Sequence, residues 1–89
     1  MTCWTYEELR RFVGKVAEIR ITEGEVLRAK VFHVDPEHRD LAVDRPIETT
    51  QPWHYEGDAP GTGYAIPWDY IAGIREVGDS GSQGPTGDK

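Results

Sequence analysis

In the first half of the chain, apolar side chains alternate with polar ones in short runs that end at turn-forming residues. Ala17, Ile19 and Ile21 alternate with polar neighbours in this way. Successive side chains of a β-strand point to opposite faces, so the pattern predicts a strand over Lys15–Thr22 with one solvated face. Gly24 then supplies the positive φ that a tight hairpin turn requires. The pattern favours an all-β fold.

Four further strands are expected along the rest of the chain. They lie at Val26–Val34, Leu41–Asp44, Gly63–Pro67 and Ile71–Val77, the last with Ile71, Ile74 and Val77 as its buried members. Pro46 weakens or ends the third strand, although residues 47–50 can resume pairing.

Three connections are expected between these strands. Residues 35–40 form a turn, because Pro36 has no N–H group and the carboxylate of Asp35 can bond its own backbone. Residues 51–62 are rich in proline and glycine and form a long loop. Residues 67–70 suit a single 3₁₀ turn before the last strand.

A short helix is expected at the N-terminus. Thr5 and Glu8 have the capping-box spacing, which predicts a helix from Tyr6 to Val13 that ends at Gly14. One short helix followed by five strands is the order of an SH3-like or Sm-like barrel. We therefore expect a five-stranded barrel of this kind over residues 1–77 and a disordered tail over residues 78–89.

The composition limits the class of protein. Eighty-nine residues suffice for one domain, and no apolar run approaches the roughly 20 residues that cross a bilayer. The N-terminus lacks the pattern of a secretion signal, and Cys3 is the only cysteine, so no internal disulfide can form. We expect a cytoplasmic protein with no membrane association.

Part of the chain resembles the Sm/LSm family. The spacing of the first Sm motif is matched by Gly24, Ala29, Val31 and Asp35, and by the apolar strand Leu41-Ala42-Val43 after the turn. Three features depart from the family. Ala29 stands where the family prefers glycine, Asp40 stands where it has asparagine, and Pro67-Trp68 stands where the second motif has an Arg-Gly pair. An ionised Asp40 can only accept hydrogen bonds, so the usual recognition of a uracil is weakened.

The resemblance implies a nucleic-acid site and a mode of assembly. The candidate nucleic-acid residues are Asp35, His38, Arg39, Asp40 and Trp68, of which His38 aligns with the base-stacking position. The family also implies a homo-oligomeric ring, in which the fourth strand of one subunit pairs with the fifth strand of the next. RNA is disfavoured by the net charge of −6, because phosphate contacts depend on Lys and Arg.

A second set of residues points to protein or peptide binding. SH3-like barrels bind extended ligands on loop aromatics, and the candidates here are Trp53, Tyr55, Trp68 and Tyr70. The alternative favoured by the sequence is that Trp53 and Trp68 cover the open end of the barrel or fill a seam between subunits.

Metal binding and catalysis have weaker support. His33, His38 and His54 lie among acidic residues but without the spacing of a zinc site, so we expect solvated histidines and no metal or cofactor. No serine precedes the tail, Cys3 is terminal, and Glu37 with Asp40 is more simply a solvated turn. The sequence thus predicts a non-catalytic, homo-oligomeric binding or assembly module, with a monomeric or dimeric peptide-binding barrel as the alternative.

Overall fold

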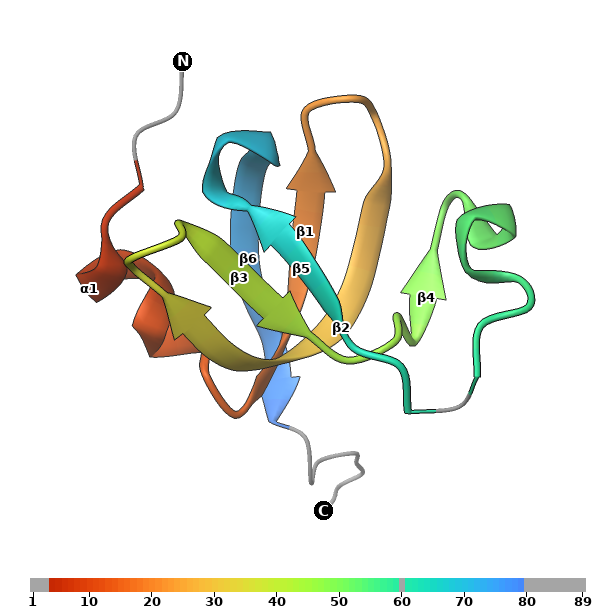
Figure 1. Cartoon of the computed structure of the whole chain (residues 1–89), viewed down its shortest axis with the longest axis horizontal. Coiled ribbons are helices and arrows are strands. Elements are labelled where there is room, and N and C mark those ends of the chain that lie inside the picture. Colours follow the sequence, from red (N-terminus) through yellow and green to blue (C-terminus); the bar gives the residue numbers. More distant parts are fainter. Residues whose placement is uncertain (1–3, 60, 80–89) are drawn as a thin grey trace.

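The structure is a computed structural model that describes residues 4–59 and 61–79. Within these residues it confirms a small, mostly β fold, with one short helix and a single antiparallel sheet of six strands (Figure 1). The strands are β1 (Lys15–Ile21), β2 (Val26–Asp35), β3 (Asp40–Val43), β4 (Glu48–Thr49), β5 (Tyr64–Pro67) and β6 (Ile71–Asp79). The helical segments are α1 (Tyr6–Leu9) and the 3₁₀ turns η1 (Arg10–Phe12), η2 (Pro52–Tyr55) and η3 (Trp68–Tyr70).

The long strand β2 is paired along both edges. β1 pairs with one edge, whereas β4 and then β3 pair with successive parts of the other edge. The register between β2 and β3 shifts between Val31 and His33, which leaves Phe32 as the extra residue of a β-bulge. A bulge bends its strand and increases the local twist. Figure 1 shows the result, with β5 crossing in front of β1 and β6.

The expected closure into a barrel is wrong for the hydrogen-bonded sheet. Its strand order is β5-β3-β2-β1-β6, with β4 attached to β2, and β5 does not pair with β6 in the described part of the chain. β5 has four residues and ends in Pro67, which has no N–H group to donate, and η3 follows at once. So short a strand offers few backbone groups with which to close the sheet.

The core lies between the two halves of the bent sheet. The predicted alternation is confirmed in β1, where Ala17 and Ile19 are fully buried and Ile21 is partly buried. In β6, Ile71 is buried, whereas Ile74 and Val77 are only partly buried. The other buried apolar residues are Leu9, Leu27, Ala29, Val31, Val34, Leu41, Val43 and Trp68.

The N-terminal capping box is confirmed, but the α-helix is shorter than predicted. The Thr5 hydroxyl accepts the backbone N–H of Glu8 at 3.2 Å, and the Glu8 carboxylate accepts the N–H of Thr5 at 3.0 Å. The α-helix ends at Leu9, and η1 continues it as a tighter turn to Phe12. Gly14 follows with a φ of +85°, a conformation that favours glycine.

Three other segments test the expected connections. Residues 48–49 do resume pairing, as β4, and residues 68–70 form the predicted 3₁₀ turn. The expected loop at 51–62 instead begins with η2. Gly78 and Asp79, assigned to the tail, form the end of β6, and residues 80–89 lie outside the described part of the chain. None of the described helices has the length and apolar character needed to cross a membrane.

The core assignment can be tested with one substitution at two positions. Ile19 is fully buried and Ile47 is 66% exposed. Ile19→Ala is expected to lower the free energy of unfolding by about 2–5 kcal/mol, because it removes buried apolar contacts and leaves a cavity. Ile47→Ala is expected to change it by less than about 1 kcal/mol. Urea denaturation measures both values, and equal losses at the two positions would contradict this core.

Candidate functional site

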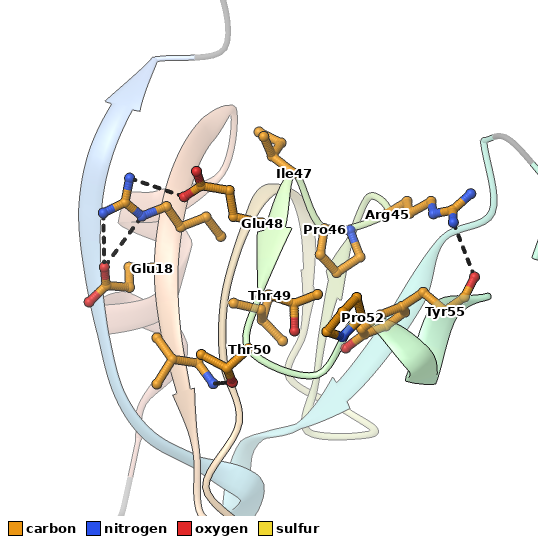
Figure 2. Close-up of a pocket in the computed structure, with 12 residues that line it drawn as sticks. Glu18, Arg45, Pro46, Ile47, Glu48, Thr49, Thr50, Pro52 and Tyr55 are labelled. Carbon is orange, nitrogen blue, oxygen red and sulfur yellow. Dashed lines mark hydrogen bonds and ion pairs between the residues drawn. The ribbon is translucent and has the colours of Figure 1, made fainter.

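A groove of about 660 Å³ lies beside β2, between β4 and the start of η2 (Figure 2). Ile47 and Glu48 stand at one side of it, and Pro46 and Pro52 lie close together on the other. Acidic, basic, hydroxyl-bearing and aliphatic side chains all line it, and none of these kinds dominates. The shape provides a binding surface without specifying a ligand.

Polar contacts hold this part of the chain in place. The guanidinium of Arg45 donates to the carbonyl oxygens of Tyr55 at 3.2 Å and of Asp58 at 3.3 Å. On the other side, the Thr50 hydroxyl accepts the backbone N–H of Val26 at 3.0 Å. Figure 2 shows Arg45, which also lines the groove, reaching the carbonyl of Tyr55. Arg45 therefore fixes η2 and the segment after it.

The four aromatic candidates for peptide binding occupy different environments. Trp53 is 61% exposed on η2, and its ring meets the ring of His54 edge to face at 6.0 Å. Tyr55 and Tyr70 both line a second cavity, beside β5. Trp68 is only 3% exposed and lies in the core. The structure thus joins Tyr55 with Tyr70, but places Trp53 and Trp68 outside their cavity.

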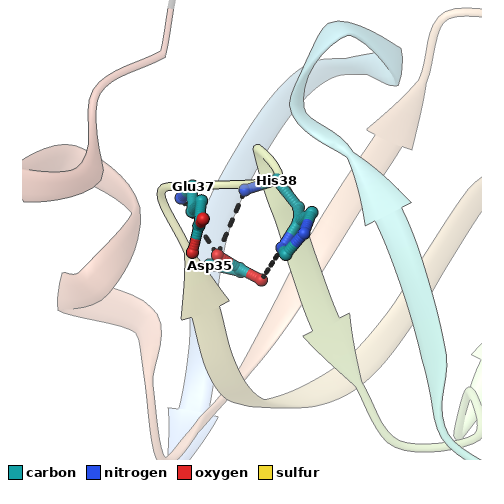
Figure 3. A group of neighbouring side chains, drawn as sticks. All are labelled: Asp35, Glu37 and His38. Carbon is teal, nitrogen blue, oxygen red and sulfur yellow. Dashed lines mark hydrogen bonds and ion pairs between the residues drawn. The ribbon is translucent and has the colours of Figure 1, made fainter.

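The turn between β2 and β3 is organised by the carboxylate of Asp35 (Figure 3). One oxygen accepts the backbone N–H groups of Glu37 at 3.0 Å and of His38 at 3.2 Å. The other lies 2.7 Å from Nδ1 of the His38 ring. The hydrogen bond with His38 lowers the pKa of Asp35, and the same bond raises the pKa of His38. The sequence prediction that Asp35 bonds its own backbone is confirmed.

Asp35, Glu37 and His38 also form a group whose potential ligand atoms lie within 4.8 Å of one another. Sequence reasoning considered these residues together with His33 and His54, which the structure does not bring into the group. The hydrogen bonds of the turn account for the positions of Asp35 and His38, and Glu37 and His38 are exposed while Asp35 is partly exposed. We therefore assign no metal to this group.

The remaining nucleic-acid candidates meet at the end of the same turn. Arg39 has a φ of +57°, and its guanidinium carbon lies 5.0 Å from the centre of the Trp68 ring. The same guanidinium is 3.7 Å from the carboxylate of Asp69, and the carbonyl of Arg39 accepts the N–H of Trp68 at 2.9 Å. Asp40 begins β3 and pairs with Asp35 across the turn. Because Trp68 is buried under Arg39, its ring has no free face for stacking on a base.

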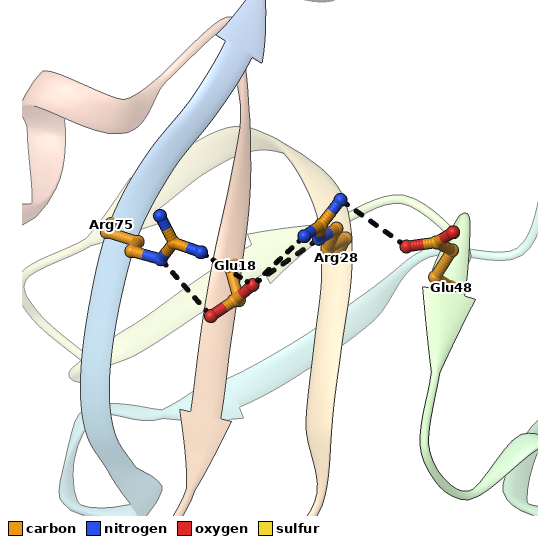
Figure 4. A network of polar contacts seen from close by, with 4 residues as sticks. All are labelled: Glu18, Arg28, Glu48 and Arg75. Atoms are coloured by element: carbon orange, nitrogen blue, oxygen red, sulfur yellow. Dashed lines mark hydrogen bonds and ion pairs between the residues drawn. The ribbon is translucent and has the colours of Figure 1, made fainter.

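A polar network crosses the outer surface of β6, β1, β2 and β4 (Figure 4). The carboxylate of Glu18 accepts from Arg75 at 3.1 and 3.2 Å and from Arg28 at 3.4 Å, and Arg28 also lies 3.5 Å from Glu48. The hydrogen bond from Arg75 lowers the pKa of Glu18. Surface ion pairs of this kind contribute little individually, so the network is best understood as a link between strands.

Sequence reasoning missed Glu25, the one charged side chain that is buried in the described residues. It lies in the hairpin after Gly24, where an acidic residue is usually solvated. The sequence did contain a signal for it. Residues 25, 27, 29 and 31 are spaced two apart, so they point to the same face of an extended chain, and residues 27, 29 and 31 face the core. Glu25 therefore points inward from the first position of a buried face.

Comparisons with known proteins identify no family: no protein-family model matches this chain, and no curated protein matches it.

The Asp35–His38 pair predicts a measurable titration. The pKa of His38 should lie above its ordinary value of 6.5, and Asp35→Asn should lower it towards that value because the charged acceptor is lost. The pair should stabilise the fold only between the depressed pKa of Asp35 and the raised pKa of His38, and this contribution is lost on either side of that window. NMR titration of the His38 ring protons measures the shift.

A matched variant distinguishes two causes of the raised pKa of His38: the hydrogen bond with Asp35 and the negative charge of other carboxylates in the turn. Glu37→Gln removes a nearby charge but no hydrogen bond to the imidazole. The pKa of His38 should remain raised in this variant. An equal fall in the two variants would show that the contact with Asp35 is not the cause.

Proposed function

We propose that this protein is a non-catalytic assembly module of the Sm-like type, with a bent sheet that stays open in the single chain, and that it associates with copies of itself through β5 and β6. The observation that carries the proposal is that the sheet stops at these two strands, each paired on one side only in the described part of the chain. An unpaired strand edge presents a row of N–H and C=O groups that can pair with another chain.

The order and shape of the elements support the family assignment. A short capped helix precedes a strongly bent antiparallel sheet, and a 3₁₀ turn separates the last two strands. Leaving aside the two-residue β4, β5 and β6 are the fourth and fifth strands in chain order. These are the strands that join neighbouring subunits in the family that the sequence resembles, and here each has an edge to offer.

A peptide-binding role is the second candidate, and Trp53 favours it. Its side chain is 61% exposed, and it follows Pro52, which lines the groove. Exposed tryptophans are typical anchors for a protein partner. This role needs no assembly, so the oligomeric state distinguishes the two candidates.

One chain has a mass of 10.0 kDa. The assembly proposal predicts that light scattering after size-exclusion chromatography gives two or more times this mass. Ala65 in β5 and Ala72 in β6 are exposed. The double variant Ala65→Lys, Ala72→Lys should shift the protein towards monomer, because charged side chains on edge strands oppose strand addition. Ala59→Lys makes the same chemical change at an exposed loop position and should leave the mass unchanged. A wild-type monomer at micromolar concentration would remove this proposal and leave the peptide-binding candidate.

RNA binding, the ligand that the family resemblance suggests, is tested at Asp40. Asp40→Asn should raise the affinity for oligouridylate at low salt by about fivefold, because an amide can both donate to and accept from a base. Glu37→Gln removes one negative charge from the same turn and serves as the control. Fluorescence anisotropy measures both affinities. Equal gains would reflect charge alone, and no gain would show that this turn is not a base pocket.

A further inference from the structure

A second cavity, of about 290 Å³, is lined by residues from the β1–β2 hairpin, β5, η2 and η3. Its apolar and aromatic lining includes Leu27, Val43, Tyr55, Tyr64, Ile66 and Tyr70. Its carboxylates are those of Glu23 and Glu25, its one imidazole is that of His54, and no lysine or arginine is among the described residues that line it. The cavity is therefore apolar with an acidic component, and its volume suits a small ligand.

Glu25 carries the unusual feature of this cavity. The residue is 6% exposed, and one carboxylate oxygen accepts the hydroxyl groups of Thr49 and of Tyr55, the latter at 2.8 Å. The other oxygen lies 3.3 Å from Nδ1 of His54, a longer contact with a half-exposed ring. Within the described residues His54 is the only ion-pair partner of Glu25, and it supplies a positive charge only when it is protonated. A buried carboxylate that has hydrogen-bond donors but no permanent positive charge beside it favours the approach of a cation.

The tyrosines provide walls suited to such a cation. The rings of Tyr55 and Tyr64 meet edge to face at 5.1 Å. The hydroxyl of Tyr64 donates to the carboxylate of Asp58, which fixes the ring, while Tyr55 is held by Glu25. Burial raises the pKa of Tyr55, and the hydrogen bond to Asp58 raises that of Tyr64, so both phenols stay neutral donors. Aromatic faces attract ammonium and guanidinium groups.

We propose that this cavity binds an organic cation: a primary ammonium or guanidinium group on a short apolar stem. The charged group would approach the Glu25 oxygen that faces His54, and the stem would pack against Leu27, Ile66 and Tyr70. Such a group is carried by free small amines and by the lysine or arginine side chain of a peptide. The proposal does not depend on assembly, because every residue that it uses belongs to one copy of the chain.

Benzylammonium and benzyl alcohol test the proposal directly, because they share size and shape but differ in charge. NMR titration of the full chain should show saturable shifts near Glu25 and Tyr70 with benzylammonium. Binding of the alcohol should be about tenfold weaker or worse, since a hydrogen bond to a charged group is worth more than a neutral one. Equal affinities, or no saturable shift with benzylammonium, would overturn the proposal.

Variants locate the site and keep the test independent of folding effects. Glu25→Gln keeps the shape of the side chain and should weaken benzylammonium binding about tenfold, whereas Glu23→Gln, which removes a charge from the exposed rim, should weaken it much less. Tyr70→Ala removes a half-exposed wall and should also weaken binding, with the dispersion of the amide spectrum confirming the fold. Equal losses of affinity in the two glutamine variants would show that binding depends only on the net charge, and would overturn the assignment of the site to Glu25.

The same titration distinguishes the two sources of the cation. Lysine and arginine blocked at both termini present the side chain as a peptide would. If a blocked residue binds more tightly than benzylammonium, the cavity is adapted to a peptide side chain. If it binds more weakly, the cavity is adapted to a free small amine.

Discussion

The bend of β2 is the constraint on which the rest of the structure depends. A strand of ten residues pairs with β1 along one edge and with β4 and β3 in turn along the other. The bulge at Phe32 marks where its pairing with β3 changes register. Since the sheet bends here, the inward side chains of β1 and β6 can face those of β3 and share one core, which includes Ile19, Ile71 and Leu41. A flat sheet of the same strands would leave that face exposed to water.

The segment between β3 and β5 is held to this sheet by polar contacts more than by apolar burial. Glu25, in the hairpin just before β2, accepts hydrogen bonds from Thr49 in β4 and from Tyr55 in η2. Arg45 binds two carbonyl oxygens of the same segment, and Asp58 accepts from Tyr64 in β5. An inward-facing carboxylate thus organises a stretch whose described residues, 44–59 and 61–63, include none of the buried apolar side chains. Pro46 and Tyr55 of this segment line both the groove and the cavity.

The sequence predicted what depends on neighbouring residues. The alternation of β1, the capping box of Thr5 and Glu8, and the bonds of Asp35 within its turn are local patterns, and all three are present. The α-helical extent was overestimated, because the continuation beyond Leu9 is a tighter turn with the same apolar spacing. η2 and the open ends of the sheet were missed, because they depend on contacts across the fold such as those of Arg45.

The candidate sites show the same division. The sequence made Trp53 and Trp68 equal candidates for peptide binding. In the structure Trp68 is buried under Arg39, whereas Trp53 is exposed. The backbone bond from Trp68 to Arg39, between residues 29 positions apart, helps fix that difference and leaves no local signature. Glu25 could have been found from its phase with Leu27 and Ala29. Its partners could not, because Thr49 and Tyr55 lie more than 20 residues away and meet it only through β4 and η2.

The negative charge of the chain opposes the proposed assembly but favours the proposed binding of a cation. Copies that each carry a net charge of −6 repel one another, so assembly through β5 and β6 has to rely on backbone hydrogen bonds and apolar contact. Salt screens that repulsion and should favour the assembly, whereas contacts with phosphate groups weaken as salt is added. An organic cation is attracted to the same acidic chain, and at Glu25 it meets a carboxylate that is buried and therefore less screened than the surface charges. The two proposed interactions therefore respond in opposite ways to the charge of the chain, and they meet at β5, whose residues form one end of the sheet and also line the cavity of Glu25.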